Sequence, residues 1–172
     1  MKSHHAELLD ENIVEVWLRR DPVRWMAGLA GGLLSGLVML LAAMISAKVA
    51  QVDALFPIKV AAVPLLGAGA TEFAAKGSVL AVGLFTHLFL CAVLGVVFAH
   101  FTGAVRTVKG LLGYGLVWGV FAWIFIFNLF VQAFTEIFAL QLPSGLALPI
   151  HLLFGLTLAS VAWFDQMFRQ KS

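Results

Sequence analysis

The chain has 172 residues, of which 62% are hydrophobic and only 12% are charged, and its formal net charge is +2. This composition excludes a soluble domain, which needs more charged surface, and a mean hydropathy of +0.99 places the chain in a lipid bilayer. The basic residues flank apolar stretches instead of forming a folded patch, which argues against a nucleic-acid partner. We therefore expect one integral membrane domain over residues 1–172.

Residues 1–21 predict a short cytoplasmic amphipathic helix. Apolar side chains recur on one helical face, at Leu9, Ile13, Val16 and Trp17. Acidic residues come early and Arg19 and Arg20 come late, an order that the helix dipole favours. The acidic leader excludes a secretory signal peptide, which would begin with basic residues. Two interpretations stay open: a helix that lies on the membrane surface, or a docking surface for a partner.

Four long apolar stretches predict four membrane-spanning helices. Their approximate bounds are 22–48, 77–102, 109–135 and 145–168. Each reaches the roughly 20 residues that a ~30 Å hydrocarbon core requires, and continuous apolar runs exclude strands. Segment 52–70 is apolar too, but charged residues and prolines interrupt it, so we expect an interfacial or re-entrant segment on the outer side. The predicted fold is an all-α integral membrane four-helix bundle.

The basic residues are distributed unequally between the two sides of these spans. Eight of the eleven lie on the side that holds both termini: Lys2, Arg19, Arg20, Arg24, Arg106, Lys109, Arg169 and Lys171. Because basic residues are enriched on the cytoplasmic side of membrane proteins, this asymmetry predicts that both termini are cytoplasmic.

Two histidines stand at matching points of an apparent internal repeat. His87 lies within Gly83-Leu84-Phe85-Thr86-His87-Leu88-Phe89, and His151 lies within Ala147-Leu148-Pro149-Ile150-His151-Leu152-Leu153. The span before each histidine carries glycines four residues apart, a spacing that lets helices pack closely in lipid. These glycines are Gly28, Gly32 and Gly36 in the first half and Gly115 and Gly119 in the second. An ionisable residue inside a span is a functional-site hypothesis by default.

In an up-down-up-down bundle the second and fourth spans lie on a diagonal, so His87 and His151 could converge. That arrangement resembles b-type cytochromes, and the resemblance implies haem b with these two imidazoles as axial ligands. His100 follows His87 by thirteen residues and faces another direction.

Three other interpretations of the histidine pair remain open. Cys91, one turn after His87, could join His87 and His151 around copper or zinc. The imidazoles could instead only hydrogen-bond to neighbouring helices. They could also line a path for protons or ions together with the polar residues of the third span, Asn128, Gln132 and Glu136.

The patterns Gly28-Leu29-Ala30-Gly31-Gly32-Leu33 and Gly83-Leu84-Phe85-Thr86-His87-Leu88-Phe89-Leu90 resemble those of small uncharacterised four-span bacterial inner-membrane proteins. The resemblance implies a bacterial inner-membrane bundle without an assigned activity. No enzyme signature appears in the sequence, so we expect a non-enzymatic accessory or structural subunit of a membrane complex. Its expected partners are the lipid bilayer and other membrane subunits or further copies of itself. The alternatives are a small haem b electron-transfer subunit and a small transporter or channel.

Overall fold

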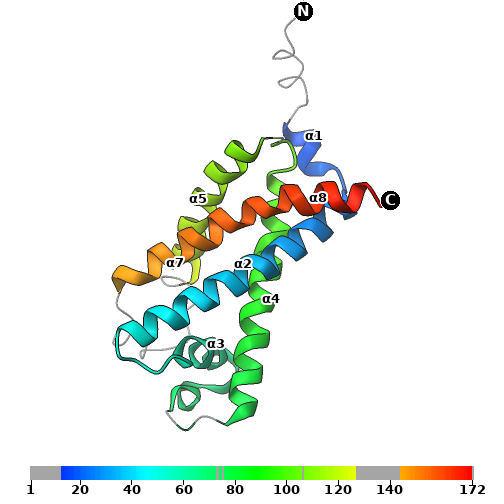
Figure 1. Ribbon diagram of the computed structural model, residues 1–172. Coiled ribbons are helices and arrows are strands. Elements are labelled where there is room, and N and C mark those ends of the chain that lie inside the picture. Colours follow the sequence, from blue (N-terminus) through cyan, green and yellow to red (C-terminus); the bar gives the residue numbers. More distant parts are fainter. Residues whose placement is uncertain (1–12, 73, 75, 106, 127–143, 172) are drawn as a thin grey trace, which may run out of the picture.

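The computed structural model of the protein describes residues 13–171, except residues 73, 75, 106 and 127–143. All regular structure in this part of the chain is helical (Figure 1), which confirms the all-helical prediction. The elements, with η marking a 3₁₀ helix, are α1 (Ile13–Leu18), α2 (Pro22–Val49), α3 (Phe56–Leu66), η1 (Ala68–Thr71), α4 (Gly77–Phe101), α5 (Val108–Ile124), α7 (Ser144–Thr157), η4 (Leu158–Ser160) and α8 (Val161–Arg169).

Three stretches of helix are long and apolar enough to cross a membrane: α2, α4 and the run Leu146–Arg169, which α7, η4 and α8 form together. They coincide with the predicted spans at 22–48, 77–102 and 145–168, and they indicate a membrane protein. The predicted span at 109–135 begins with α5, but its last third, residues 127–135, falls outside the described residues. A total of four spans therefore stays a prediction.

Capping residues explain where two of the helices begin. The Asp21 carboxylate accepts a hydrogen bond from the backbone N–H of Arg24 at 3.1 Å, and Pro22 occupies the first turn of α2. The Thr107 hydroxyl accepts a hydrogen bond from the N–H of Gly110 at 3.1 Å and caps α5 in the same way. At α2, the capped start fixes the position of Arg24, which becomes important at the site described below.

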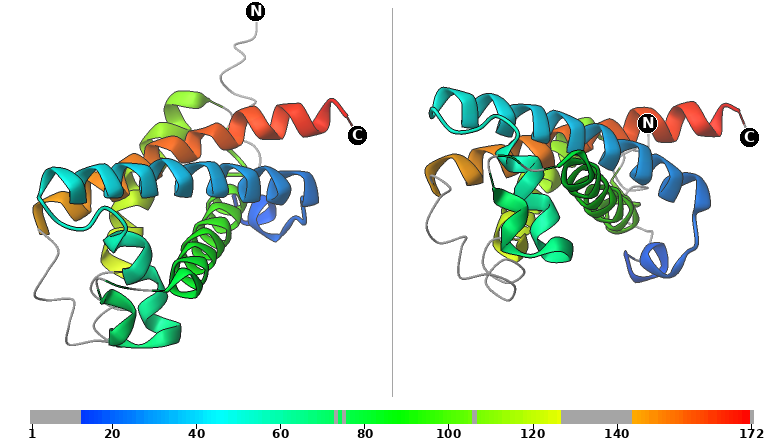
Figure 2. Two further views of the ribbon diagram at one scale, coloured as in Figure 1. Left: turned by 60° about the horizontal axis from the view of Figure 1, so that its bottom comes forward. Right: turned by 90° about the horizontal axis from the view of Figure 1, so that it is seen from below.

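Helix α2 lies at the centre of the molecule. Helix α4 crosses it, while α7 and α8 run antiparallel alongside it (Figures 1 and 2). Helix α5 packs chiefly against α7, and α3 packs against α4. Side chains from α2, α4, α5 and the last span meet in one core, formed by Ala27, Cys91, Phe98, Ala99, Leu111, Phe154, Leu158 and Val161. The long helices thus form two pairs, α2 with α4 and α5 with α7, which meet along α2.

The predicted amphipathic helix of residues 1–21 is represented by α1, and residues 1–12 lie outside the described part. Helix α1 is docked on the end of α4. The indole Nε1 of Trp17 donates to the carbonyl oxygen of Phe101 at 3.1 Å, and the two rings meet edge to face at 5.5 Å. This contact holds α1 beside the end of a membrane-spanning helix.

Helix α3 occupies most of the predicted interfacial segment 52–70. Its 11 residues span about 16 Å, roughly half of the ~30 Å that a membrane crossing needs. It is bound tightly to α4, because a Cβ at Gly83 would overlap the carbonyl group of Ile58. Lys59 is 2% exposed and pairs with Asp53, and its ammonium group donates to the carbonyl oxygen of Glu72 at 3.0 Å. The location of α3 on the outer membrane surface stays a prediction.

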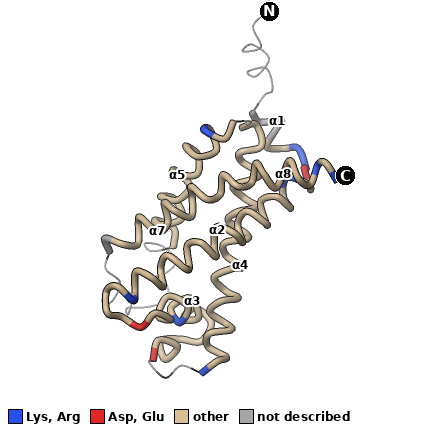
Figure 3. The backbone as a smooth tube through the Cα atoms, in the orientation of Figure 1, with Lys and Arg blue, Asp and Glu red and all other residues tan. Residues whose placement is uncertain are grey.

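Charged residues of the described chain gather at the two ends of the helices and leave the middle uncharged (Figure 3). One end holds α1, the start of α2 and α5 and the end of α8; the other holds α3. An uncharged middle is what a bilayer core requires, since a charge at its centre is costly. Which end is cytoplasmic stays a prediction from the distribution of basic residues.

Candidate functional site

The first helix pair, α2 with α4, is held together at glycines. A Cβ placed on Gly28 would lie 2.6 Å from the carbonyl oxygen of Gly95, and one on Gly32 would overlap the carbonyl oxygen of Cys91. A Cβ on Gly36 would lie 2.7 Å from the Cβ of Cys91. The backbones of α2 and α4 can approach this closely only because α2 carries no side chains at these positions.

The second pair, α5 with α7, uses the same kind of contact. A Cβ on Gly115 would overlap the carbonyl oxygen of Gly155, and one on Gly119 would lie 2.5 Å from the carbonyl oxygen of His151. In each pair one of these glycines faces the residue four positions after the histidine: Gly32 faces Cys91, and Gly115 faces Gly155. Both predicted site histidines therefore lie one turn from a close helix crossing.

His87 projects from α4 onto α2. Its Nε2 lies 2.9 Å from the carbonyl oxygen of Gly36, and the Sγ of Cys91 lies 3.7 Å from the same nitrogen. A carbonyl oxygen only accepts hydrogen bonds, so Nε2 must carry a proton and donate it. His87 thus links α4 to α2 through a backbone carbonyl.

His151 is 4% exposed in α7 and is oriented by its own helix. Its Nδ1 lies 2.8 Å from the carbonyl oxygen of Ala147, one turn earlier, so Nδ1 carries a proton. Cys91, one turn after His87, and Phe154, three residues after His151, belong to the same buried core. The structure therefore brings the two predicted site residues into one region of the core but gives them different hydrogen-bond partners.

The haem hypothesis can be tested against these contacts. Two axial imidazoles must each aim an unprotonated ring nitrogen at the iron. The Nε2 of His87 instead donates to Gly36, and the α2 backbone occupies the space in front of it. The arrangement in the described residues does not fit a haem between His87 and His151, and their role as axial ligands stays a prediction.

The metal and polar-path hypotheses have different outcomes. Among the described residues, no three His, Cys, Asp or Glu side chains come together in a group that could hold a metal ion. This includes the set His87, Cys91 and His151. The polar residues of the third span, Asn128, Gln132 and Glu136, lie outside the described residues, and the polar path stays a prediction.

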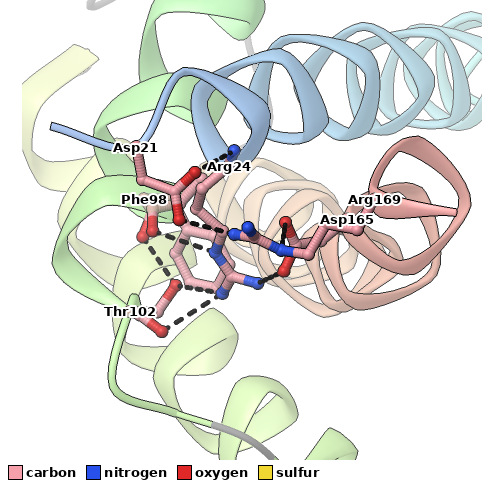
Figure 4. Close-up of polar contacts among 7 residues, drawn as sticks. Asp21, Arg24, Phe98, Thr102, Asp165 and Arg169 are labelled. Atoms are coloured by element: carbon pink, nitrogen blue, oxygen red, sulfur yellow. Dashed lines mark hydrogen bonds and ion pairs between the residues drawn. The ribbon is translucent and has the colours of Figure 1, made fainter. Parts of the chain in front are cut away.

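A cluster of polar contacts lies at the end of the molecule where α2 begins and α8 ends (Figure 4). Arg24 is 7% exposed. Its Nε donates to the carbonyl oxygen of Ala99 at 3.3 Å, and its Nη2 donates to the carbonyl and hydroxyl oxygens of Thr102 at 3.1 and 3.4 Å. Its Nη1 lies 3.2 Å from Oδ2 of Asp165. Arg24 thus caps the last carbonyls of α4, where a cation is favoured, and ties α2 to both α4 and α8.

Arg169 extends this cluster to the start of α2. Its Nε lies 3.1 Å from Oδ1 of Asp165, and its Nη2 pairs with Asp21 (Figure 4). Burial alone would raise the pKa of the Asp21 carboxyl. The hydrogen bonds from Arg169 and from the backbone N–H of Arg24 outweigh burial and lower this pKa below its usual value. The end of the last span is therefore fastened to the start of the first.

Sequence reasoning anticipated only part of this cluster. Asp165 and Arg169 are four residues apart on one predicted helix, a spacing that predicts an ion pair, and the structure contains this pair. Sequence reasoning treated Arg24 only as a sign of topology and missed the contact with Asp165. One sequence signal could have predicted this contact. Arg24 and Asp165 each lie about one turn inside a predicted span, and both lie at the same side of the membrane.

Comparisons with known proteins found no matching family model, no matching curated protein and no matching solved structure.

Proposed function

We propose that this chain is a non-enzymatic accessory or structural subunit of a protein complex in the bacterial inner membrane, with both termini in the cytoplasm. The proposal is supported by how the described polar residues are used. His87, Arg24 and Asp165 join the chain's own helices to one another, as expected of a scaffold. A partner must then be met largely inside the bilayer, because little of the described chain extends beyond the helices.

The observation that carries the proposal is the outer face of α5. Only one narrow stripe of this helix is buried, against α7. On the outer face, Gly113 has open space beside it, and Tyr114 is 55% exposed. Its phenol hydroxyl makes no hydrogen bond within the described part of the chain, so it can donate to or accept from a group outside the chain. An outward glycine beside a polar group is typical of a surface where another membrane helix packs.

The proposal can be tested by photo-crosslinking in native membranes. A crosslinking amino acid at Val117, which is 69% exposed on the same face of α5, should give a discrete adduct with a different membrane protein. The matched control is Phe85 on α4, which is 67% exposed and should give lipid adducts only. Lipid adducts at both positions would refute the proposal, and adducts only with a second copy of the chain would show a homo-oligomer instead.

A variant sharpens this test. Gly113→Leu should abolish the Val117 adduct without lowering the chain's own stability, because nothing in the described structure lies within 4 Å of a Cβ at this position. A loss of the adduct that comes with unfolding would not support a partner surface. Thermal unfolding of the purified variant in detergent distinguishes these results.

A further inference from the structure

The carbonyl groups at the end of α4 are all hydrogen-bonded within the protein. The last four carbonyls of an α-helix have no partner in the helix itself, so water or side chains must satisfy them. In α4 these carbonyls belong to Ala99, His100, Phe101 and the capping Thr102. Arg24 donates to the first and the last of them, at 3.3 and 3.1 Å, and the backbone N–H of Gly103 donates to that of His100 at 3.2 Å.

Trp17 of α1 supplies the remaining partner. Its indole Nε1 donates to the carbonyl oxygen of Phe101 at 3.1 Å. The N–H is the only polar group of an indole, so the rest of this side chain, which belongs to a residue that is 39% exposed, is apolar. Leu18, the next residue, is 79% exposed, and Phe101 is 47% exposed. Trp17, Leu18 and Phe101 thus form an apolar surface, here named the α1 patch, beside a helix end that requires no water.

The length of α4 places the α1 patch at the boundary of the bilayer. Helix α4 has 25 residues and is about 37 Å long. This length exceeds the ~30 Å hydrocarbon core but not the ~40–45 Å of a bilayer with its headgroups. Leu18 also lies only four positions before Pro22, the first residue of α2. The ends of two membrane-spanning helices therefore bring the patch to the depth at which headgroups meet acyl chains.

The hydrogen bonds at the end of α4 favour lipid over water around the patch. A helix end in water can leave its carbonyls to the solvent, whereas a helix end in lipid must satisfy them within the protein. Arg24, Gly103 and Trp17 together do this for α4. Tryptophan is also enriched at the membrane interface, where an apolar ring and an N–H are both accommodated.

We propose that α1 is embedded in the surface of the bilayer, where Trp17 caps the end of α4 and the α1 patch contacts lipid acyl chains. The partner of this surface is lipid, and not a protein in the aqueous phase. Short helices with apolar side chains lie at the boundary between headgroups and acyl chains in the same way. The inference does not depend on the accessory role proposed above.

Spin labels can distinguish lipid, water and protein around the patch. A nitroxide is attached to Leu18→Cys in the full-length Cys91→Ala chain, reconstituted in liposomes of phosphatidylethanolamine and phosphatidylglycerol. Oxygen concentrates in lipid and a nickel chelate stays in water, so the ratio of their collision rates with the label reports its surroundings. The Leu18 label should collide more with oxygen. The control label at Lys171→Cys, an exposed position just beyond α8, should collide more with the nickel chelate.

Trp17→Phe tests the hydrogen bond to Phe101. This variant keeps an aromatic ring but removes the N–H, so the carbonyl of Phe101 must take up water. The Leu18 label should then collide more often with the nickel chelate. The matched control is Trp163→Phe, which changes a 60% exposed tryptophan of α8 and should leave the Leu18 label unaffected.

Three results would overturn the proposal. A nickel collision rate at Leu18 equal to that at Lys171 would place α1 in water. Shielding of the Leu18 label from both reagents would show that protein covers the patch. An unchanged label in a folded Trp17→Phe variant would refute the capping role of Trp17. Thermal unfolding in detergent establishes whether this variant is folded, and the label at Leu18 with Trp17 intact tests the lipid contact without it.

Discussion

The two glycine-lined helix pairs use the same packing contact but employ their histidines differently. In the α2–α4 pair, His87 reaches across the crossing and donates to the Gly36 carbonyl of the other helix. In the α5–α7 pair, His151 donates to Ala147 on its own helix. The comparison teaches that histidines at similar points of two helix pairs need not make similar contacts, because the hydrogen bond that a side chain makes depends on which groups the facing helix places near it.

The two pairs are joined along α2, and the largest predicted effect concerns that junction. Arg24→Gln should lower the free energy of unfolding by about 3 kcal/mol or more, because it leaves the buried Asp165 with one cation fewer and removes the hydrogen bonds to α4. Unfolding in increasing SDS measures the effect.

The double variant Arg24→Gln/Asp165→Asn provides the control for Arg24. It should lose less stability than the two single losses added together, because it removes both members of the ion pair. Strictly additive losses would show that the two groups do not interact.

The next largest effect compares how much the two close helix crossings, α2 with α4 and α5 with α7, contribute to stability. Gly95→Ile and Gly155→Ile should each cost about 1–3 kcal/mol in the free energy of unfolding, because the new side chain would collide with the backbone of the facing helix. Gly113→Ile on the open face of α5 is the control and should cost less than about 0.5 kcal/mol. If Gly113→Ile were as damaging as Gly155→Ile, close packing would not explain the losses.

A smaller effect is expected from replacing the histidines, and it should differ between His87 and His151. His87→Leu removes a hydrogen bond between helices, which in membrane proteins is worth about 0.6 kcal/mol and at most about 1.7 kcal/mol. It should broaden the distance distribution between spin labels on α2 and α4, measured by electron paramagnetic resonance in a Cys91→Ala background. His151→Leu should leave that distribution unchanged, since His151 donates within α7. Equal broadening by both variants would contradict the difference between the pairs.

The positions of the membrane helices could be predicted from the sequence because local signals define them. A continuous apolar run predicted a span over 22–48, and α2 covers Pro22–Val49. The break at η4 was not predicted, because no Gly or Pro marks it. It lies where Val161 presses against Gly31 of α2, a contact between distant segments.

The contacts of the candidate site were harder to predict from the sequence, because they too join segments that are far apart in the chain. The partner of His87 is a backbone carbonyl, and carbonyls leave no trace in a sequence. Arg24 and Asp165 are 141 positions apart, so only the packing of α2 against α8 brings them together. Local patterns identified the residues with unusual chemistry but not the groups that they contact.

The smallest predicted effect lies at the exposed edge of the junction, between Asp21 and Arg169. The pKa of Asp21 is lowered in the folded protein, so its contribution to stability is complete above the ordinary value of 3.8 and is lost as the pH falls through the lower folded value. Asp21→Asn keeps a capping oxygen but removes the charge, and at neutral pH it should cost no more than about 1 kcal/mol because the pair is partly exposed. Unfolding curves of the wild type and the variant should therefore differ at pH 7, begin to converge as the pH falls below 3.8, and coincide below the lower folded pKa. High salt at pH 7 should reduce the difference by screening, whereas a difference that persists at low pH would show that Asp21 stabilises the helix start by its shape and not by its charge.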